Sequence, residues 1–171
     1  MAIRNLRYDT DPILRKKSRE VEVVDDRIRK IVEDMFDTMY KYDGVGLSAP
    51  QIGILRRIIV VDTYEEGEKL AIINPEIVKV EGKKEYLEGC LSFPDVYGKV
   101  DRPYKAVIKG LDENGKKIEI HAEDILAEAI LHEIDHLNGV LFIDMVKKGT
   151  LVKELNDGTN QKLDDDTYIK I

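Results

Sequence analysis

The sequence predicts an α+β fold in which antiparallel strands pack around one helix late in the chain, with a further long helix near the N-terminus. Three observations support this prediction. Apolar residues recur at helical spacing after residue 25, and again between about 124 and 137. Between these segments lie several short runs rich in Val and Ile, which are typical of strands. Two of the runs flank an Asn-Gly pair at 114–115, which is a strong signal for a hairpin.

Length and composition indicate one water-soluble domain. The 171 residues fit a single domain spanning 1–171, within which 147–171 is expected to be variable. A hydrophobic content of 43% is too high for overall disorder, and the net charge of −7 argues against nucleic acid as a partner. The chain has one cysteine, no apolar stretch typical of a signal peptide and no run long enough to span a bilayer. We therefore expect a cytoplasmic protein with no intrachain disulfide and no membrane partner.

The first predicted elements are a short helical turn and a long amphipathic helix. Asp11-Pro12 is typical of an N-cap followed by the first helical position. The long helix is expected to begin near residues 25–26 and to end at Asp43-Gly44. Its apolar face consists of Ile28, Ile31, Val32, Met35 and Met39.

A Gly- and Pro-rich segment separates this helix from the strands. Residues 44–53 are expected to lack regular structure. A buried strand follows at 57–62, and a second at 69–73 is expected to stop at Asn74-Pro75. Further strands are predicted at 77–80, 85–91, 106–111 and 117–120.

The last clear helix is predicted from about residue 124 to 137, with Asn138-Gly139 as its stop signal. Beyond residue 147 no helical stripe is present. Asp157-Gly158 suggests a turn, and residues 167–171 have the composition of a strand.

The strongest chemical signal is His132-Glu-Ile-Asp-His136, an HExxH pattern on the late helix. Two His at positions i and i+4 lie on one helix face, so both imidazoles can reach one metal ion. Glu133, next to the first His, is placed to contact a metal-held water as a general base and is not itself expected to be a ligand. The pattern therefore predicts a metal-binding HExxH helix.

A catalytic metal site of this type needs a third protein ligand. Phe142 occupies the position at which metzincins carry a third His, and it cannot bind a metal. Glu154 lies beyond the helix stop in an irregular region, and His121 lies near a strand end, where a surface role is expected. Cys90, in Glu88-Gly-Cys-Leu-Ser-Phe-Pro94, is the preferred candidate, although a lone Cys is often only a small buried hydrophobe.

Two alternatives remain open at this point. A zinc endopeptidase would use His132 and His136 with Glu154, and it would not depend on Cys90. A protein without enzymatic activity would hold a structural zinc through Cys90 and the two His. Such a closed site needs a fourth residue, for which the sequence offers no convincing candidate.

Three segments together resemble the peptide deformylase family. They are Gly44-Val-Gly-Leu-Ser-Ala-Pro-Gln51, Glu88-Gly-Cys-Leu-Ser92 and His132-Glu-Ile-Asp-His136, and their order and separations also fit. The resemblance runs from about Asp11 to Asp144. It implies a metal-dependent hydrolase that removes the formyl group from the N-terminal formylmethionine of newly synthesised proteins and releases formate.

The resemblance also implies a role for each matching residue. Glu133 would be the acid/base residue. The developing oxyanion would be stabilised by the side-chain amide of Gln51 and the backbone N–H of Leu91. The backbone of Val45 and Gly46 would hold the substrate in an extended conformation. The implied metal ligands are Cys90, His132 and His136, with water in the fourth position.

The family resemblance further implies a cofactor and partners. Family members favour Fe²⁺, and Zn²⁺, Ni²⁺ or Co²⁺ can occupy the same site. The implied partners are N-formylmethionyl nascent polypeptides, together with a transient contact with the ribosome. The tail lacks the long basic C-terminal helix of some members, so a ribosome-docking role is not expected of it.

Some positions depart from the family pattern. Ser48 stands where Ala is usual, a change expected to have little consequence, and Leu131 stands where Gln usually precedes the first His. Glu128 lies one turn before His132, near the expected methionine pocket, where it either lines the pocket or faces solvent. Residues 96–98 lack the Arg with which many bacterial members bind the substrate backbone. Glu88 is expected either to orient the site by hydrogen bonding or to be a solvated strand residue.

Overall fold

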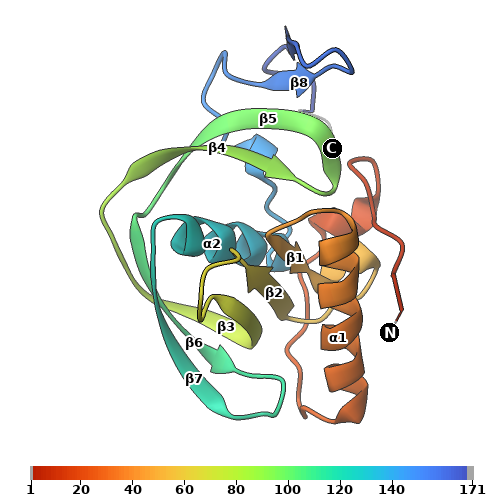
Figure 1. The fold of residues 1–171 in the computed structure, drawn as a ribbon, viewed down its shortest axis with the longest axis vertical. Coiled ribbons are helices and arrows are strands. Elements are labelled where there is room, and N and C mark those ends of the chain that lie inside the picture. Colours follow the sequence, from red (N-terminus) through yellow and green to blue (C-terminus); the bar gives the residue numbers. More distant parts are fainter. Residues whose placement is uncertain (1, 169–171) are drawn as a thin grey trace.

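Two antiparallel sheets and two α-helices make up the computed structural model, which describes residues 2–168 (Figure 1). One sheet has five strands in the order β1-β2-β3-β6-β7, and the other has four in the order β4-β5-β8-β9. The α+β prediction is thus confirmed. The five-stranded sheet contains β1 (Gly46–Ser48), β2 (Ile58–Asp62), β3 (Lys69–Glu81), β6 (Lys105–Leu111) and β7 (Lys117–Glu123). The four-stranded sheet contains β4 (Lys84–Cys90), β5 (Phe93–Arg102), β8 (Val152–Glu154) and β9 (Asn160–Lys162).

The predicted early helices are both present. Asp11 caps a 3-10 helix at Pro12–Arg15 by accepting a hydrogen bond from the Ile13 N–H. Helix α1 spans Asp26–Lys41, with Asp25 as its N-cap. Its apolar face packs on the five-stranded sheet in a core that also holds Leu47, Ile58 and Val60.

Two predictions about the five-stranded sheet were wrong. Residues 46–48 form β1 despite the Gly and Pro around them, because they pair with Ile59–Val61 of β2, and Ala49–Ile52 forms a 3-10 helix. Asn74-Pro75 does not end a strand, because β3 continues to Glu81. Its pairing with β6 shifts register around the proline, which accommodates the residue. Proline has no backbone N–H to donate to a ladder, but a local irregularity lets the pairing with β6 resume.

The β6–β7 hairpin forms as predicted, with Gly115 at φ +79° in its turn. Strand β5 was not predicted, because Pro94 and Gly98 interrupt its apolar pattern. It pairs with β4 along most of its length and supplies Phe93, Val96 and Val100 to a separate apolar cluster.

Helix α2 spans Ile125–Leu137 and lies between the β4–β5 arc and strands β1 and β2 (Figure 1). It is buried along most of its length, and it packs on β2, β6 and β7 through residues such as Ile130 and Ile134. Asn138 is the C-cap, and Gly139 follows with φ +72°. The carbonyl of Arg15 lies against Gly139 where a Cβ would stand, so a larger residue would collide with it.

The C-terminal segment adds the hairpin β8–β9 to the edge of β5, with Gly158 in the predicted turn. The predicted strand at 167–171 is wrong for residues 167–168, which lie in a turn, and residues 169–171 lie outside the described part of the chain. Among residues 2–168, no helix is long and apolar enough to cross a membrane.

Candidate active site

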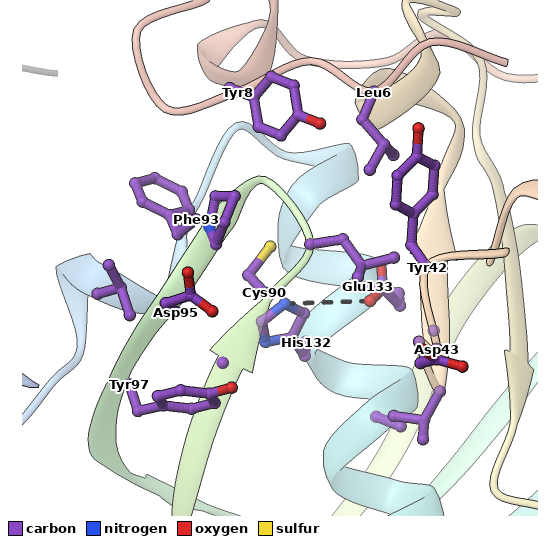
Figure 2. Close-up of a pocket in the computed structure, with 18 of the residues that line it drawn as sticks. Leu6, Tyr8, Tyr42, Asp43, Cys90, Phe93, Asp95, Tyr97, His132 and Glu133 are labelled. Atoms are coloured by element: carbon purple, nitrogen blue, oxygen red, sulfur yellow. Dashed lines mark ion pairs between the residues drawn. The ribbon is translucent and has the colours of Figure 1, made fainter. Parts of the chain in front are cut away.

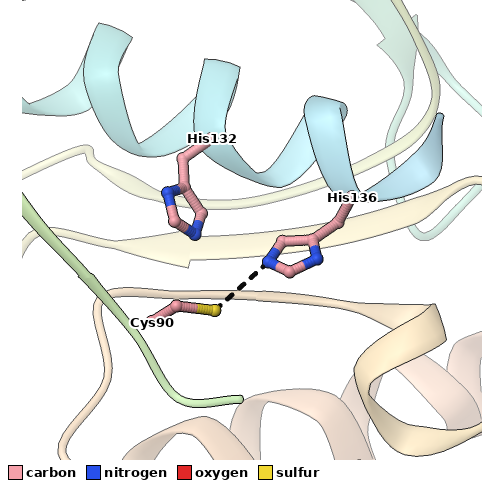
Figure 3. A group of neighbouring side chains, drawn as sticks. All are labelled: Cys90, His132 and His136. Carbon is pink, nitrogen blue, oxygen red and sulfur yellow. Dashed lines mark hydrogen bonds between the residues drawn. The ribbon is translucent and has the colours of Figure 1, made fainter. Parts of the chain in front are cut away.

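Cys90, His132 and His136 come together although they are far apart in the sequence (Figure 3). The two His lie one turn apart on α2, and Cys90 lies at the end of β4. One ligand atom from each residue lies within 4.8 Å of the others, and Cys90 Sγ is 3.3 Å from His136 Nε2.

The local structure of β4 and β5 explains the position of Cys90. Their pairing shifts register between Gly89 and Cys90, so Cys90 pairs with Phe93 across a tight connection. A Cβ on Gly89 would lie 2.7 Å from a ring carbon of Tyr97. Glycine therefore permits the close approach of the Tyr97 ring at this position.

Glu88 orients the His132 ring. Its carboxylate accepts a hydrogen bond from His132 Nδ1 at 2.7 Å, which leaves Nε2 directed toward Cys90 and His136. Burial by itself would raise the pKa of Glu88. The hydrogen bonds from Arg102 and His132 outweigh burial and lower the pKa to about 2. Glu88 is therefore an ionised, buried carboxylate, and the alternative of a solvated strand residue is excluded.

Sequence reasoning missed Arg102, the buried partner of Glu88. Its guanidinium donates two hydrogen bonds to Glu88, at 2.7 and 2.9 Å, and one to Asp135 at 2.5 Å. This paired cation compensates the buried charge of Glu88. The alternation of Val96, Gly98, Val100 and Arg102 on one face of β5 could have indicated an inward-pointing Arg.

The donor set fits a divalent transition metal. A thiol and two imidazoles are ligands that iron and zinc both accept. Burial and the neighbouring His132 lower the pKa of His136, which favours the neutral ring that a metal requires. His136 Nδ1 is buried with no hydrogen-bond partner among the described residues. The His132 ring, by contrast, is oriented by the hydrogen bond from its Nδ1 to Glu88.

Glu133 lies beside this cluster without joining it. Its Oε1 is 4.0 Å from His132 Nε2, and its buried Oε2 has no hydrogen-bond partner among the described residues. Burial raises the pKa of Glu133 to about 7, which suits a group that both accepts and returns a proton near neutral pH. A Cβ on Gly46 would lie 2.8 Å from Glu133 Oε1, so glycine leaves room for this carboxylate.

Gln51 contacts Cys90. Its Nε2 donates to Ser92 Oγ at 3.0 Å and to Cys90 Sγ at 3.4 Å. The side chain is buried and belongs to the 3-10 helix that follows β1. The structure therefore brings a side-chain amide donor to the thiol.

A cleft of about 620 Å³ opens over Cys90, His132 and Glu133 (Figure 2). Leu91, Val45 and Gly46 line it, as does Glu128, whose half-buried carboxyl has a pKa raised to about 7 by burial and by the charge of Glu88. Sequence reasoning missed further lining residues on the N-terminal segment and on β5, which are Leu6, Tyr8, Phe93, Asp95 and Tyr97. Their segments meet only in the folded chain, so no local motif marks them.

The other candidates from the sequence lie apart from the cluster. His121 is exposed and contacts Glu119, as expected of a surface residue. Glu154 is exposed on β8, and Phe142 is buried with its ring stacked near His132. Leu131 packs into the core between α2 and the five-stranded sheet.

This fold, with a half-buried thiol and two buried imidazoles clustered beside a buried carboxylate at a cleft, is that of a metal-dependent hydrolase. The family model described as polypeptide deformylase matches residues 3–151. The chain belongs to this family. Its activity is removal of the formyl group from the N-terminus of newly synthesised polypeptides.

Individual relatives agree with this assignment. The chain is 53% identical to peptide deformylase 2 of Clostridium acetobutylicum over 147 residues, which cover 85% of this chain and 97% of the relative. It is 56% identical to the peptide deformylase of Thermoanaerobacter pseudethanolicus over 144 residues, which cover 84% and 89% of the two chains. The crystal structure of a peptide deformylase from Legionella pneumophila superposes with a TM-score of 0.82 at 49% identity, covering 85% of this chain and 87% of the other.

Proposed function

We propose that this chain releases formate from N-formylmethionyl polypeptides with a metal ion held by Cys90, His132 and His136. The observation that carries the proposal is the proximity of their ligand atoms, within 4.8 Å of one another, beside the buried Glu133. The Nδ1 hydrogen bond from His132 to Glu88 supports it, because such a contact fixes the ring of a metal ligand.

The proposed metal is Fe²⁺, with Zn²⁺, Ni²⁺ or Co²⁺ as alternatives in the same site. A divalent metal supplies a Lewis acid that makes a water molecule nucleophilic and polarises the formyl group. Ligand affinity alone would favour zinc over iron, so the preference for iron rests on the family resemblance.

Glu133 is the proposed acid/base residue. Its unpaired Oε2 can accept the proton that the attacking water loses as oxygen bonds to the formyl carbon. The same carboxyl then gives a proton to the amine nitrogen as the carbon–nitrogen bond breaks. The products are formate and a free methionine N-terminus.

Gln51 and Leu91 are the proposed donors to the developing oxyanion. The Gln51 amide already reaches the Cys90 side of the site, and the Leu91 backbone lines the cleft directly after Cys90. Donors fixed in advance stabilise charge that develops during the reaction.

Val45 and Gly46 are the proposed binding residues for the substrate backbone. Strand β1 lies at the edge of its sheet, so one of its two sides has no strand partner among the described residues. Val45 and Gly46 lie at this edge and line the cleft. An extended peptide can add to such an edge through main-chain hydrogen bonds.

The proposal extends to the whole chain and its setting. We assign residues 1–171 to one catalytic domain, supported by the pairing of β8 with β5 and by Tyr168 packing on Phe93. The proposed location is the cytoplasm, since the proposed substrates are nascent polypeptides, and the proposal includes a transient contact with the ribosome.

The endopeptidase alternative is less well supported, because Glu154 is exposed and does not join the two His. Protein prepared without oxygen, with its metal measured, should release formate from a formyl-Met peptide and leave internal bonds intact. Cleavage of internal bonds without formate release would contradict the proposal and favour the endopeptidase.

A further inference from the structure

Ser48 contacts Gln51 in a way that the sequence did not indicate. The backbone N–H of Ser48 donates to Gln51 Oε1 at 2.9 Å, and the Ser48 hydroxyl lies 3.1 Å from the same oxygen. At the other end of the amide, Gln51 Nε2 donates to Ser92 Oγ at 3.0 Å. All three side chains are buried, so water does not compete for these bonds.

These contacts fix which end of the amide faces Cys90. A backbone N–H can only donate, so the oxygen end of Gln51 must face Ser48. The hydroxyl of Ser48 is a second donor to that oxygen, which makes the reversed orientation still less favourable. The amide nitrogen is consequently directed toward Ser92 and Cys90, where a donor is needed.

We propose that Ser48 is a positioning residue for the deformylation reaction, whose hydroxyl holds the Gln51 amide in its donating orientation. This rests on the proposed function of Gln51 as an oxyanion donor. An alanine at position 48 would keep the backbone donor and lose the hydroxyl. Losing the hydroxyl should therefore weaken the hold on the Gln51 amide only in part. The loss should slow the chemical step and leave substrate binding unchanged.

The test is a double-mutant cycle with Ser48→Ala and Gln51→Ala, measured as kcat and KM for a formyl-Met peptide. One net hydrogen bond corresponds to a factor of about three to ten, so Ser48→Ala should lower kcat by that factor with KM unchanged. In the Gln51→Ala background, Ser48→Ala should have no further effect, because the group that it positions is absent.

Ser18→Ala is the matched control. Ser18 is also buried, and its hydroxyl has no hydrogen-bond partner among the described residues, so its removal should leave kcat unchanged. Ser92→Ala is a second variant of the network, and it should also lower kcat only when Gln51 is present. Bound metal and the melting temperature are measured on every sample to exclude loss of folding.

The outcomes separate the two proposals. If Gln51→Ala is impaired but Ser48→Ala has normal turnover, the positioning role is wrong and the role of Gln51 stands. An equal loss from Ser48→Ala in both backgrounds also overturns the positioning role, since Ser48 would then act independently of Gln51. If Gln51→Ala itself turns over normally, both proposals are wrong.

Discussion

At the scale of single residues, the active site depends on partners that hold a few reactive groups in position. Glu88 and Arg102 show this most clearly. The ion pair between them is buried, and it fixes His132 through a 2.7 Å hydrogen bond. Breaking a buried pair by removing one partner leaves an uncompensated charge, so both residues are needed together.

Glu133 carries the clearest prediction at this scale. Glu133→Ala should bind metal and fold normally, because the carboxylate is not one of the clustered ligand groups. Proton transfer usually contributes about 10²–10⁴ in rate, and the role proposed for Glu133 involves two proton transfers, so kcat/KM should fall by at least that range. Glu133→Asp should also be poor, since it retracts the carboxylate by one methylene. Metal content and kcat/KM are measured on the same samples, and loss of metal along with activity would show a structural role instead.

The motifs predicted the residues that the structure brings together, because spacing along a helix determines which side chains share a face. His132 and His136 are such a pair, and Cys90 was already the preferred third candidate before the family resemblance supported it. Arg102 and Tyr8 were not found from the sequence. Each reaches the site through long-range packing that no local pattern records.

At the scale of elements, helix and hairpin signals located their elements correctly, whereas strands without a local signal were missed. Helix α1 and the β6–β7 hairpin have strong local signals, and both form as predicted. Strand β1 has almost no local strand propensity, yet it forms because β2 offers a partner. Strand β5 was missed for the same reason, since its pairing with β4 outweighs the breaks at Pro94 and Gly98.

Helix α1 also holds the N-terminal segment in place through hydrogen bonds to Asp34. This buried carboxylate accepts hydrogen bonds from the Ala2 N–H and from Arg4, and it forms an ion pair with Lys30. Burial raises the pKa of Asp34, but the bonds from Arg4 and Lys30 outweigh burial and lower the pKa below its ordinary value. A lowered pKa stabilises the fold above the unfolded-state pKa, and this stabilisation is lost as pH falls through the folded-state value.

Asp34→Asn should therefore lower the melting temperature at pH 7 by several degrees, since 1 kcal/mol corresponds to about 2–4 °C in a chain of this size. The difference from the parent protein should begin to shrink below about pH 4, where Asp34 of the unfolded chain takes up a proton, and should shrink further as pH falls through the lower pKa of the folded state. Glu33→Gln is the control, since Glu33 is exposed on the same helix and forms only a 3.6 Å pair with Lys30. A deficit that is the same at both pH values would contradict the electrostatic explanation.

At the scale of the whole molecule, α2 and three chain segments far apart in the sequence enclose one site. The cleft is lined from the N-terminal segment, the α1–β1 connection, the β4–β5 turn and α2 (Figure 2). The C-terminal segment supports one wall of the cleft, because Leu163 and Tyr168 pack on the apolar cluster that contains Phe93. Residues 152–168 lie beyond the part of the chain that the family model matches.

Ending the chain after Leu151 should destabilise the protein. The shortened chain would uncover Phe93 and Leu151. Losing about 2–4 kcal/mol of apolar burial should lower the melting temperature by about 5–15 °C. Deformylation should weaken as well, because Phe93 pairs with Cys90 across the turn. Tyr168→Ala should show a smaller shift in the same direction. Unchanged melting and turnover in both proteins would mean that the tail is dispensable.

The central claim is that a metal held by Cys90, His132 and His136 is required for deformylation, and a metal titration tests it most directly. Metal-stripped protein and its Cys90→Ala variant are titrated with Fe²⁺ without oxygen, and bound metal and formate release are measured in the same samples. The parent protein should be inactive when stripped and regain activity in proportion to bound metal, up to about one ion per chain, while Cys90→Ala should retain little metal. Full turnover by the stripped protein, or a Cys90→Ala variant with one tightly bound ion and normal activity, would contradict the claim.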